Sequence, residues 1–192
     1  MSLVDFKWYA LQVRPKWEQR VARVLSLKGY TVFAPTFTIR KPGRPRGSDT
    51  TAPIFPAYVL CRYEATVAHR MVDSPCVIRL VGYGHTPTPV DDREMASLQL
   101  LYASGLPSYP WQYYRRGQRI RVTSGALAGV EGYFVRIKGT DRVIVNLTIL
   151  QRSIMVEFDG AMVEALPSVP EPAVVAHAWR ERIRGEAAAV VA

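Results

Sequence analysis

The residues of this 192-residue sequence that could carry out acid–base or metal chemistry are scattered and form no recognisable motif. The three histidines, His69, His85 and His177, have no spacing that would place two of them on one metal. Asp91 and Asp92 are adjacent, but they stand at the start of a helical pattern, where negative charge suits the helix dipole. No nucleophile motif or phosphate-binding glycine motif is present. The sequence therefore predicts no catalytic site, no metal and no cofactor.

The cysteines and the first residues of the chain indicate in which cellular compartment the protein works. Cys61 and Cys76 cannot form a disulfide framework and are not part of a C-x-x-C pair, so we expect buried, reduced thiols. Asp5 and Lys7 fall where a signal peptide would need its apolar core, and no run of roughly 18 apolar residues follows. We therefore expect a cytoplasmic protein that does not enter a membrane.

The net charge of +9 comes mainly from the first quarter of the chain. Residues 1–50 hold ten Lys and Arg against three Asp and Glu, out of 25 and 16 in the whole sequence. A positive field of this kind attracts phosphates, but a solvated surface that keeps the protein soluble explains it equally well. Composition alone leaves both interpretations open.

The N-terminal half alternates strand and helix patterns. Aromatic and β-branched residues from Phe6 to Val13 predict a strand, and Pro15 is well placed to begin a helix that runs to about Lys28. The order of patterns predicts an α+β domain, with helices packed on a single antiparallel or mixed sheet. Further strands are expected at 31–39, 54–63 and 76–84, helices at 65–75 and 91–103, and a mobile basic hairpin tip at 40–49.

The C-terminal half has a different pattern. Two prolines and a lack of periodicity predict a linker at 107–114. Residues 115–166 alternate apolar and polar side chains in short runs broken by glycines, which is typical of a small β-barrel. The remaining residues, 167–192, are rich in proline and then alanine, and we expect a flexible tail without an assigned function.

Two blocks of residues, in this order and at this spacing, resemble one known family. The first block contains Trp8 and Tyr9 before a basic helix, the run Phe55-Pro56-Ala57-Tyr58-Val59-Leu60, and Val81-Gly82; the second contains Gly117, Ile120, Val122, Gly125, Gly129, Gly132, Arg152, Val156, Glu157, Val163 and Glu164. Together they resemble the NusG family, whose members join an N-terminal NGN domain to a C-terminal KOW domain. The resemblance implies an NGN domain at residues 5–106 and an SH3-like KOW β-barrel at 115–166.

The resemblance implies that the NGN domain binds RNA polymerase through the clamp helices of the β′ subunit. If residues 55–63 form a strand, alternation puts Tyr58 and Leu60 on one face, which predicts an exposed apolar surface there. The alternative is that these aromatic and apolar residues all belong to the core. The residues expected to bind the polymerase are Phe55, Pro56, Tyr58 and Leu60, with Trp8 and Tyr9 as neighbours on the first strand.

The basic side chains around the first helix form a second candidate site. The resemblance places this helix near the non-template DNA strand of the transcription bubble, and the residues expected to contact DNA phosphates are Arg14, Lys16, Arg20 and Arg23. The basic tip at 40–49 would add to this surface. The alternative is a solvated helix face without a ligand.

In the KOW domain, Ile149, Leu150 and Arg152 take the place of a turn that family members use toward a small-subunit ribosomal protein or the termination factor Rho. This chain departs from the family pattern there, with leucine for an aromatic at Leu150 and at Leu127, and Gln151 for glycine. Leucine buries less area than an aromatic anchor, so these two partnerships are less favoured.

The sequence thus predicts a monomeric transcription elongation factor that binds RNA polymerase and reduces pausing and termination. The departures favour a specialised paralogue, similar to antiterminators of long operons. Two alternatives stay open: a housekeeping NusG that assists Rho-dependent termination and transcription–translation coupling, and a KOW protein associated with the ribosome or RNA.

Overall fold

The computed structural model describes residues 5–39, 50–64, 66, 71, 73–83, 86–114, 117–137, 139–158 and 163–167. Several predicted features lie outside these residues. They are the basic tip at 40–49, most of the helix expected at 65–75, the three histidines, and the tail beyond residue 167.

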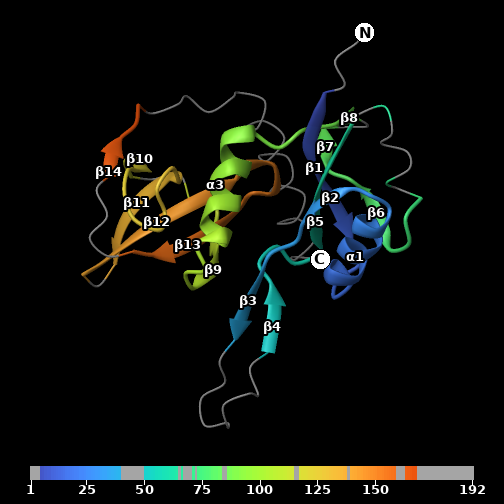
Figure 1. Cartoon of the computed structure of the whole chain (residues 1–192), viewed down its shortest axis with the longest axis horizontal. Coiled ribbons are helices and arrows are strands. Elements are labelled where there is room, and N and C mark those ends of the chain that lie inside the picture. The colour runs from blue at the N-terminus through green and yellow to red at the C-terminus, as the bar shows by residue number, and fades with distance from the viewer. Residues whose placement is uncertain are drawn as a thin grey trace, which may run out of the picture.

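The N-terminal part is built on a four-stranded antiparallel sheet with the order β2-β5-β1-β6. β1 and β5 pair along nearly their whole length, from Phe6 opposite Glu64 to Gln12 opposite Tyr58. A hairpin of β3 and β4 projects away from this sheet (Figure 1). The strands are β1 (Phe6–Val13), β2 (Thr31–Phe33), β3 (Thr36–Ile39), β4 (Thr50–Pro53), β5 (Tyr58–Glu64), β6 (Val77–Leu80), β7 (Gly82–Tyr83) and β8 (Thr86–Pro87).

Both faces of this sheet are covered, because consecutive side chains in the middle of β1 and at the start of β5 are apolar and point to opposite faces. Helix α1 (Glu18–Leu27) packs on one face, where Tyr9, Leu11 and Tyr63 share a cluster with its buried side chains. Helix α3 (Asp92–Ala103) packs on the other face, over Trp8 and Leu60. The sheet is therefore the middle layer of three.

The two helices differ in how well their starts were predicted. α3 begins as expected, and the Asp91 side chain caps it by accepting hydrogen bonds from the backbone N–H groups of Arg93 and Glu94. α1 begins at Glu18 and not at Pro15, because Lys16 has a φ of 70° and so cannot belong to a right-handed helix. Among the described residues, no helix is long and apolar enough to cross a membrane.

Three of the predicted strands are interrupted. The strand expected at 76–84 is divided into β6 and β7 at Val81. The strand expected at 31–39 is divided into β2 and β3 at Ala34 and Pro35. The strand expected at 54–63 begins only at Tyr58, because residues 55–58 form a turn. In these last two places a proline lies at the break, where its missing N–H is best tolerated.

The C-terminal part is a six-stranded antiparallel sheet with the order β14-β10-β11-β12-β13-β9. β9 lies within the residues predicted as a linker and pairs with β13, and its Pro110 is tolerated because β9 is an edge strand. Closure into a KOW barrel and the division into domains remain predictions. The strands are β9 (Ser108–Gln112), β10 (Arg119–Val122), β11 (Glu131–Ile137), β12 (Thr140–Leu147), β13 (Arg152–Glu157) and β14 (Val163–Ala165).

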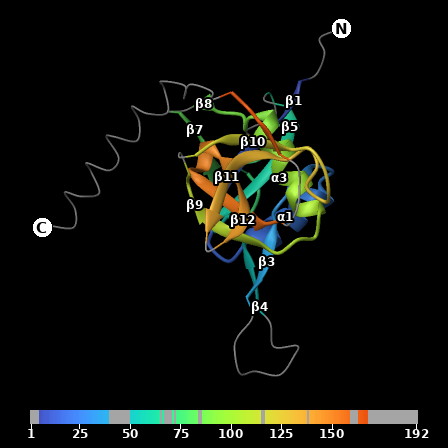
Figure 2. The same ribbon diagram turned by 90° about the vertical axis from the view of Figure 1, so that its left-hand side faces the viewer.

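Helix α3 lies between the two sheets (Figures 1 and 2). Its Leu98 and Leu101 belong to an apolar cluster that also contains Leu60 of β5 and Val143 and Val145 of β12. The same helix makes a polar contact with the C-terminal sheet, since the backbone N–H of Glu131 donates to Ser97 Oγ over 3.0 Å. The two parts of the chain therefore share one core.

We expect Leu98→Ala to destabilise the whole protein by about 3 kcal/mol, because Leu98 is fully buried in this shared core. Leu100→Ala on the same helix serves as the control, since Leu100 is 43% exposed, and its cost should stay below about 1 kcal/mol. Urea unfolding measures both. Equal losses of stability in the two variants would contradict the shared core.

Candidate functional site

The run Phe55-Pro56-Ala57-Tyr58 forms a tight turn between β4 and β5. Tyr58 N donates to the Phe55 carbonyl oxygen over 3.1 Å, and Ala57 has a φ of 67°. Proline at the second position with a positive φ at the third defines a type II turn. Pro56 is exposed and Tyr58 is half-buried, so this turn presents two apolar side chains at the surface.

The backbone N–H and carbonyl groups of Ala57 are both hydrogen-bonded to residues outside the turn. Its N–H donates to Glu18 Oε1 over 2.7 Å, and its carbonyl oxygen accepts from Val13 N over 2.9 Å. Glu18 is only 4% exposed. The start of α1, the end of β1 and the turn are thus joined by hydrogen bonds.

The other predicted polymerase-binding residues are buried. Trp8, Phe55 and Leu60 belong to the core on the α3 side of the sheet. Tyr9 lies on the opposite face and stacks on Tyr63 with ring centroids 4.6 Å apart. The prediction that one face of β5 is exposed was wrong, because α3 covers the face that carries Leu60. Of the six candidates, Pro56 and Tyr58 alone are accessible.

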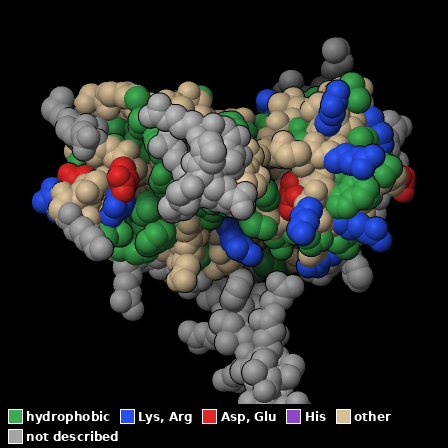
Figure 3. Space-filling view, turned by 90° about the horizontal axis from the view of Figure 1, so that it is seen from below, with side chains coloured by type: hydrophobic (Ala, Val, Ile, Leu, Met, Phe, Trp, Pro, Cys, Tyr) green, Lys and Arg blue, Asp and Glu red, His purple; other side chains and the backbone are tan. Residues whose placement is uncertain are grey.

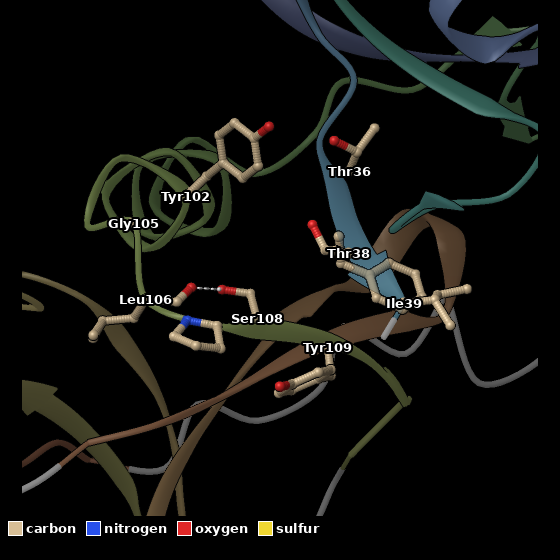
Figure 4. A pocket seen from close by; sticks show the side chains of 10 residues that line it. Thr36, Thr38, Ile39, Tyr102, Gly105, Leu106, Ser108 and Tyr109 are labelled. Atoms are coloured by element: carbon tan, nitrogen blue, oxygen red, sulfur yellow. Dashed lines mark hydrogen bonds between the residues drawn. The ribbon is translucent and has the colours of Figure 1, made fainter. Parts of the chain in front are cut away.

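A cleft of about 880 Å³ with a mixed polar and apolar lining opens beside the hairpin (Figure 4). β3 forms one wall, the C-terminal end of α3 forms another, and β9 lies across the base. Of the lining side chains that the structure describes, none is charged and more than half are apolar or aromatic. They are Thr36, Phe37, Thr38, Ile39, Tyr102, Gly105, Leu106, Pro107, Ser108 and Tyr109.

Several apolar side chains in the cleft lack cover. Ile39, Tyr102 and Tyr109 are between 41% and 43% exposed. The Tyr102 ring packs edge-on against Phe33, with ring centroids 5.6 Å apart. The Ser108 hydroxyl donates a hydrogen bond to the Leu106 carbonyl oxygen. The cleft is therefore suited to apolar side chains of a binding partner and not to acid–base chemistry. The sequence analysis missed it because its walls come from three separated segments.

The four basic candidates are all exposed, but only Arg20 and Arg23 lie on α1. Arg14 and Lys16 belong to the irregular segment before it. The prediction that the first helix carries all of these side chains was therefore wrong for Arg14 and Lys16. Within the described ranges none of the four forms an ion pair. Arg20 lies 4.7 Å from the Trp17 ring centroid. Figure 3 shows Lys and Arg side chains gathered on the half of the molecule that holds α1.

Arg20 and Arg23 also line a shallow hollow of about 600 Å³ between α1 and the segment around β2. Its other lining residues carry no charge. Two guanidinium groups without acidic neighbours in such a hollow form a surface that favours phosphate groups.

The KOW candidates lie at a short 3-10 turn, Thr148–Leu150, between β12 and β13. Gln151 follows with a φ of 51°, a conformation that favours glycine. Ile149 is half-buried and Arg152 is exposed, but Leu150 is 9% exposed. Leu127, the other departure from the family pattern, is also buried, so it offers no surface to a partner.

The turn is held against α3 by a carboxylate that the sequence analysis did not single out. Glu94 accepts hydrogen bonds from Thr148 N, over 2.8 Å, and from Thr148 Oγ1. Burial raises the pKa of Glu94 to about 7, although both bonds from Thr148 and the charge of Arg119 act in the opposite direction and Asp91 adds to the rise. Only a long-range contact joins residues 94 and 148, so no local sequence pattern could reveal it.

The other titratable groups that the structure describes show no sign of a reactive centre. Among the described residues, no three His, Cys, Asp or Glu side chains lie close enough to hold a metal. Cys61 is buried, and burial raises the pKa of its thiol to about 12. A thiol with such a pKa stays protonated at neutral pH and is a poor nucleophile.

Comparisons with known proteins found likenesses both in sequence and in structure. Residues 6–99 match the family model described as transcription termination factor nusG. The chain is 25% identical to the transcription termination/antitermination protein NusG of Lactococcus lactis, over 85% of this chain and 96% of the relative. Among solved structures it is similar to Thermotoga maritima NusG, with 22% identity, a TM-score of 0.46, and coverage of 85% of this chain and 98% of that one. It is also similar to an MjSpt4:Spt5 complex, with 14% identity, a TM-score of 0.31, and coverage of 83% and 99%.

The Glu94 contact predicts that stability depends on pH. Because its pKa is raised above the ordinary 4.5, the folded protein binds this proton more tightly than the unfolded chain does. The protonated Glu94 therefore contributes its full stabilisation of the folded state below about pH 4.5. This contribution is lost as the pH rises through about 7. In the wild type we expect the free energy of unfolding to fall by an amount on the order of 2 kcal/mol between pH 5 and 8 because of Glu94, and we expect Glu94→Gln to remove this change.

Chemical unfolding at several pH values measures this difference. Asp92→Asn is the matched control, because Asp92 lies on the same helix but is exposed, and it should keep the pH dependence of the wild type. If the free energy of unfolding of Glu94→Gln changed with pH as it does in the wild type, Glu94 would not be the group responsible.

Proposed function

Because the chain belongs to the NusG family of transcription termination and antitermination factors, we propose that it binds RNA polymerase during elongation and reduces pausing and termination. Members of this family are transcription factors and not enzymes, and they generally bind RNA polymerase. The observation that carries the proposal is the cleft beside the Phe55–Tyr58 turn, where apolar side chains are partly uncovered and no described lining residue is charged. We further propose that the protein acts in the cytoplasm as a monomer.

In the proposed complex, the β′ clamp helices of the polymerase pack against the turn and the cleft. The turn follows β4, whose partner β3 forms one wall of the cleft, so the two surfaces are adjacent in the fold. Pro56 and Tyr58 would meet one part of the apolar helix face, and Ile39 and Tyr102 another. Burial of these exposed side chains supplies the driving force, and the lack of charge avoids a desolvation cost.

The basic residues before and on α1 are proposed to contact the non-template DNA strand. Arg20 and Arg23 are exposed on one hollow surface without acidic partners, and Arg14 and Lys16 extend this charge along the chain. Contacts to phosphates would steady the upstream edge of the bubble and make binding weaker at high salt. Together with clamp binding, this would reduce pausing.

We propose a specialised antiterminator in preference to a housekeeping factor. The observation that favours it is the burial of Leu150, which leaves Ile149 and Arg152 as the accessible part of the KOW surface. A surface without an exposed aromatic anchor is poorly suited to the ribosomal protein or Rho. A housekeeping factor would bind Rho through this turn, and a ribosome-associated KOW protein would copurify with ribosomal RNA and not with polymerase.

We expect Tyr58→Ala and Ile39→Asp each to weaken binding to core RNA polymerase by about tenfold, the first by loss of buried area and the second by placing a charge in the apolar interface. Leu27→Asp is the control, because Leu27 is 81% exposed on α1, away from the cleft. Pull-down of the polymerase and elongation assays on a pausing template measure binding and activity. Wild-type affinity in both test variants would contradict the proposed surface.

Charge reversal at Arg20 and Arg23 to glutamate should reduce crosslinking to non-template DNA. It should also weaken the salt dependence of binding, because each lost phosphate contact lowers the slope of the logarithm of the binding constant against the logarithm of the salt concentration by about one unit. Arg93→Glu provides the matched control on α3, since Arg93 is exposed and far along the chain from this surface. Polymerase binding without DNA should be unaffected. If crosslinking falls equally in the control, a nonspecific charge effect explains it.

A further inference from the structure

Glu18 is the first residue of α1, and its carboxylate is buried, with 4% of the residue exposed. Buried carboxylates need an ionic or hydrogen-bonding partner, because losing water otherwise costs too much. In the described part of the chain Glu18 forms no ion pair. It accepts a hydrogen bond from Ala57 N over 2.7 Å, so its partner is the turn.

The turn needs such support because its third residue is alanine. Glycine or asparagine usually occupies this position in a type II turn, since a side chain disfavours positive φ. Ala57 nevertheless has a φ of 67°. Its N–H is not used by the hydrogen bond that closes the turn, which runs from Tyr58 N to the Phe55 carbonyl oxygen. Glu18 binds that free N–H, while Val13 N binds the Ala57 carbonyl oxygen.

We infer that Glu18 is a positioning residue: by accepting the Ala57 N–H, it selects the turn conformation that presents Pro56 and Tyr58 to a partner. The partner itself, RNA polymerase, rests on the proposed function. The effect on the turn is a property of the free protein and can be measured without any partner.

Glu18 could instead act only through the helix dipole, because an acidic residue in the first turn stabilises a helix. That role needs the negative charge, whereas positioning needs an acceptor atom at the place of Oε1. Glu18→Gln keeps an acceptor and removes the charge. Glu18→Leu fills a similar volume without an acceptor. Val21→Ala is the control for general loss of stability, because Val21 is buried on the same helix and lies in the core on the α1 side.

The first measurement is amide hydrogen exchange at Ala57 in the full chain, followed by NMR and corrected for the global stability of each variant. We expect Glu18→Leu to speed exchange at Ala57 by about tenfold, because the N–H of Ala57 loses its hydrogen-bond acceptor. Glu18→Gln and Val21→Ala should remain within about threefold of the wild type. Unchanged exchange in Glu18→Leu would refute the positioning role, whatever the polymerase does.

The second measurement is polymerase binding by the same variants. Glu18→Leu should bind about tenfold more weakly, and adding Ala57→Gly should restore most of the affinity, because glycine adopts a positive φ without strain. If Ala57 exchange rises but polymerase affinity does not fall, the link between the turn and binding is wrong. If the wild type itself fails to bind, the proposed function is wrong, and the exchange data alone decide whether Glu18 sets the turn.

Discussion

Burial on two sides of helix α3 is the constraint on which the rest of this structure depends. A twelve-residue helix normally buries one stripe and exposes the other. Here the helix covers Trp8 and Leu60 of the N-terminal sheet and also packs on β11 and β12 of the C-terminal sheet. Removing either sheet would expose apolar side chains that have no other cover. The helix therefore makes one cooperative core out of two sheets that the chain forms separately.

Polar contacts give this apolar packing a defined register. Ser97 and Glu94 lie on the side of α3 that faces the C-terminal sheet, and each accepts a backbone N–H from it, at Glu131 and Thr148. These groups are satisfied only in one relative placement of helix and sheet, which apolar contacts alone would not specify. The placement of β9 beside β13 also brings Tyr109 to the base of the cleft. The cleft therefore forms only where the N-terminal part, with β3, and the C-terminal part, with β9, pack together.

The candidate binding surfaces depend on backbone conformation as much as on side-chain type. Pro56 and Tyr58 are presented by a turn whose alanine occupies a conformation that glycine prefers, and a buried carboxylate compensates. Gln151 adopts the same kind of conformation at the KOW turn. At both places a residue with a side chain stands where glycine would be easier, and contacts from distant residues maintain the geometry.

The sequence by itself determined many of the local elements and the family resemblance. Aromatic and β-branched residues located β1, Asp91 marked the start of α3, and the runs around Trp8 and Tyr58 carried the resemblance, because each of these signals depends on neighbours within a few residues. Only the tertiary structure decided which aromatic side chains are exposed, that residues 108–112 form a strand, and that Glu94 meets Thr148. Burial and strand pairing are set by residues far apart in the chain, and a local pattern contains no information about which distant segment will cover it.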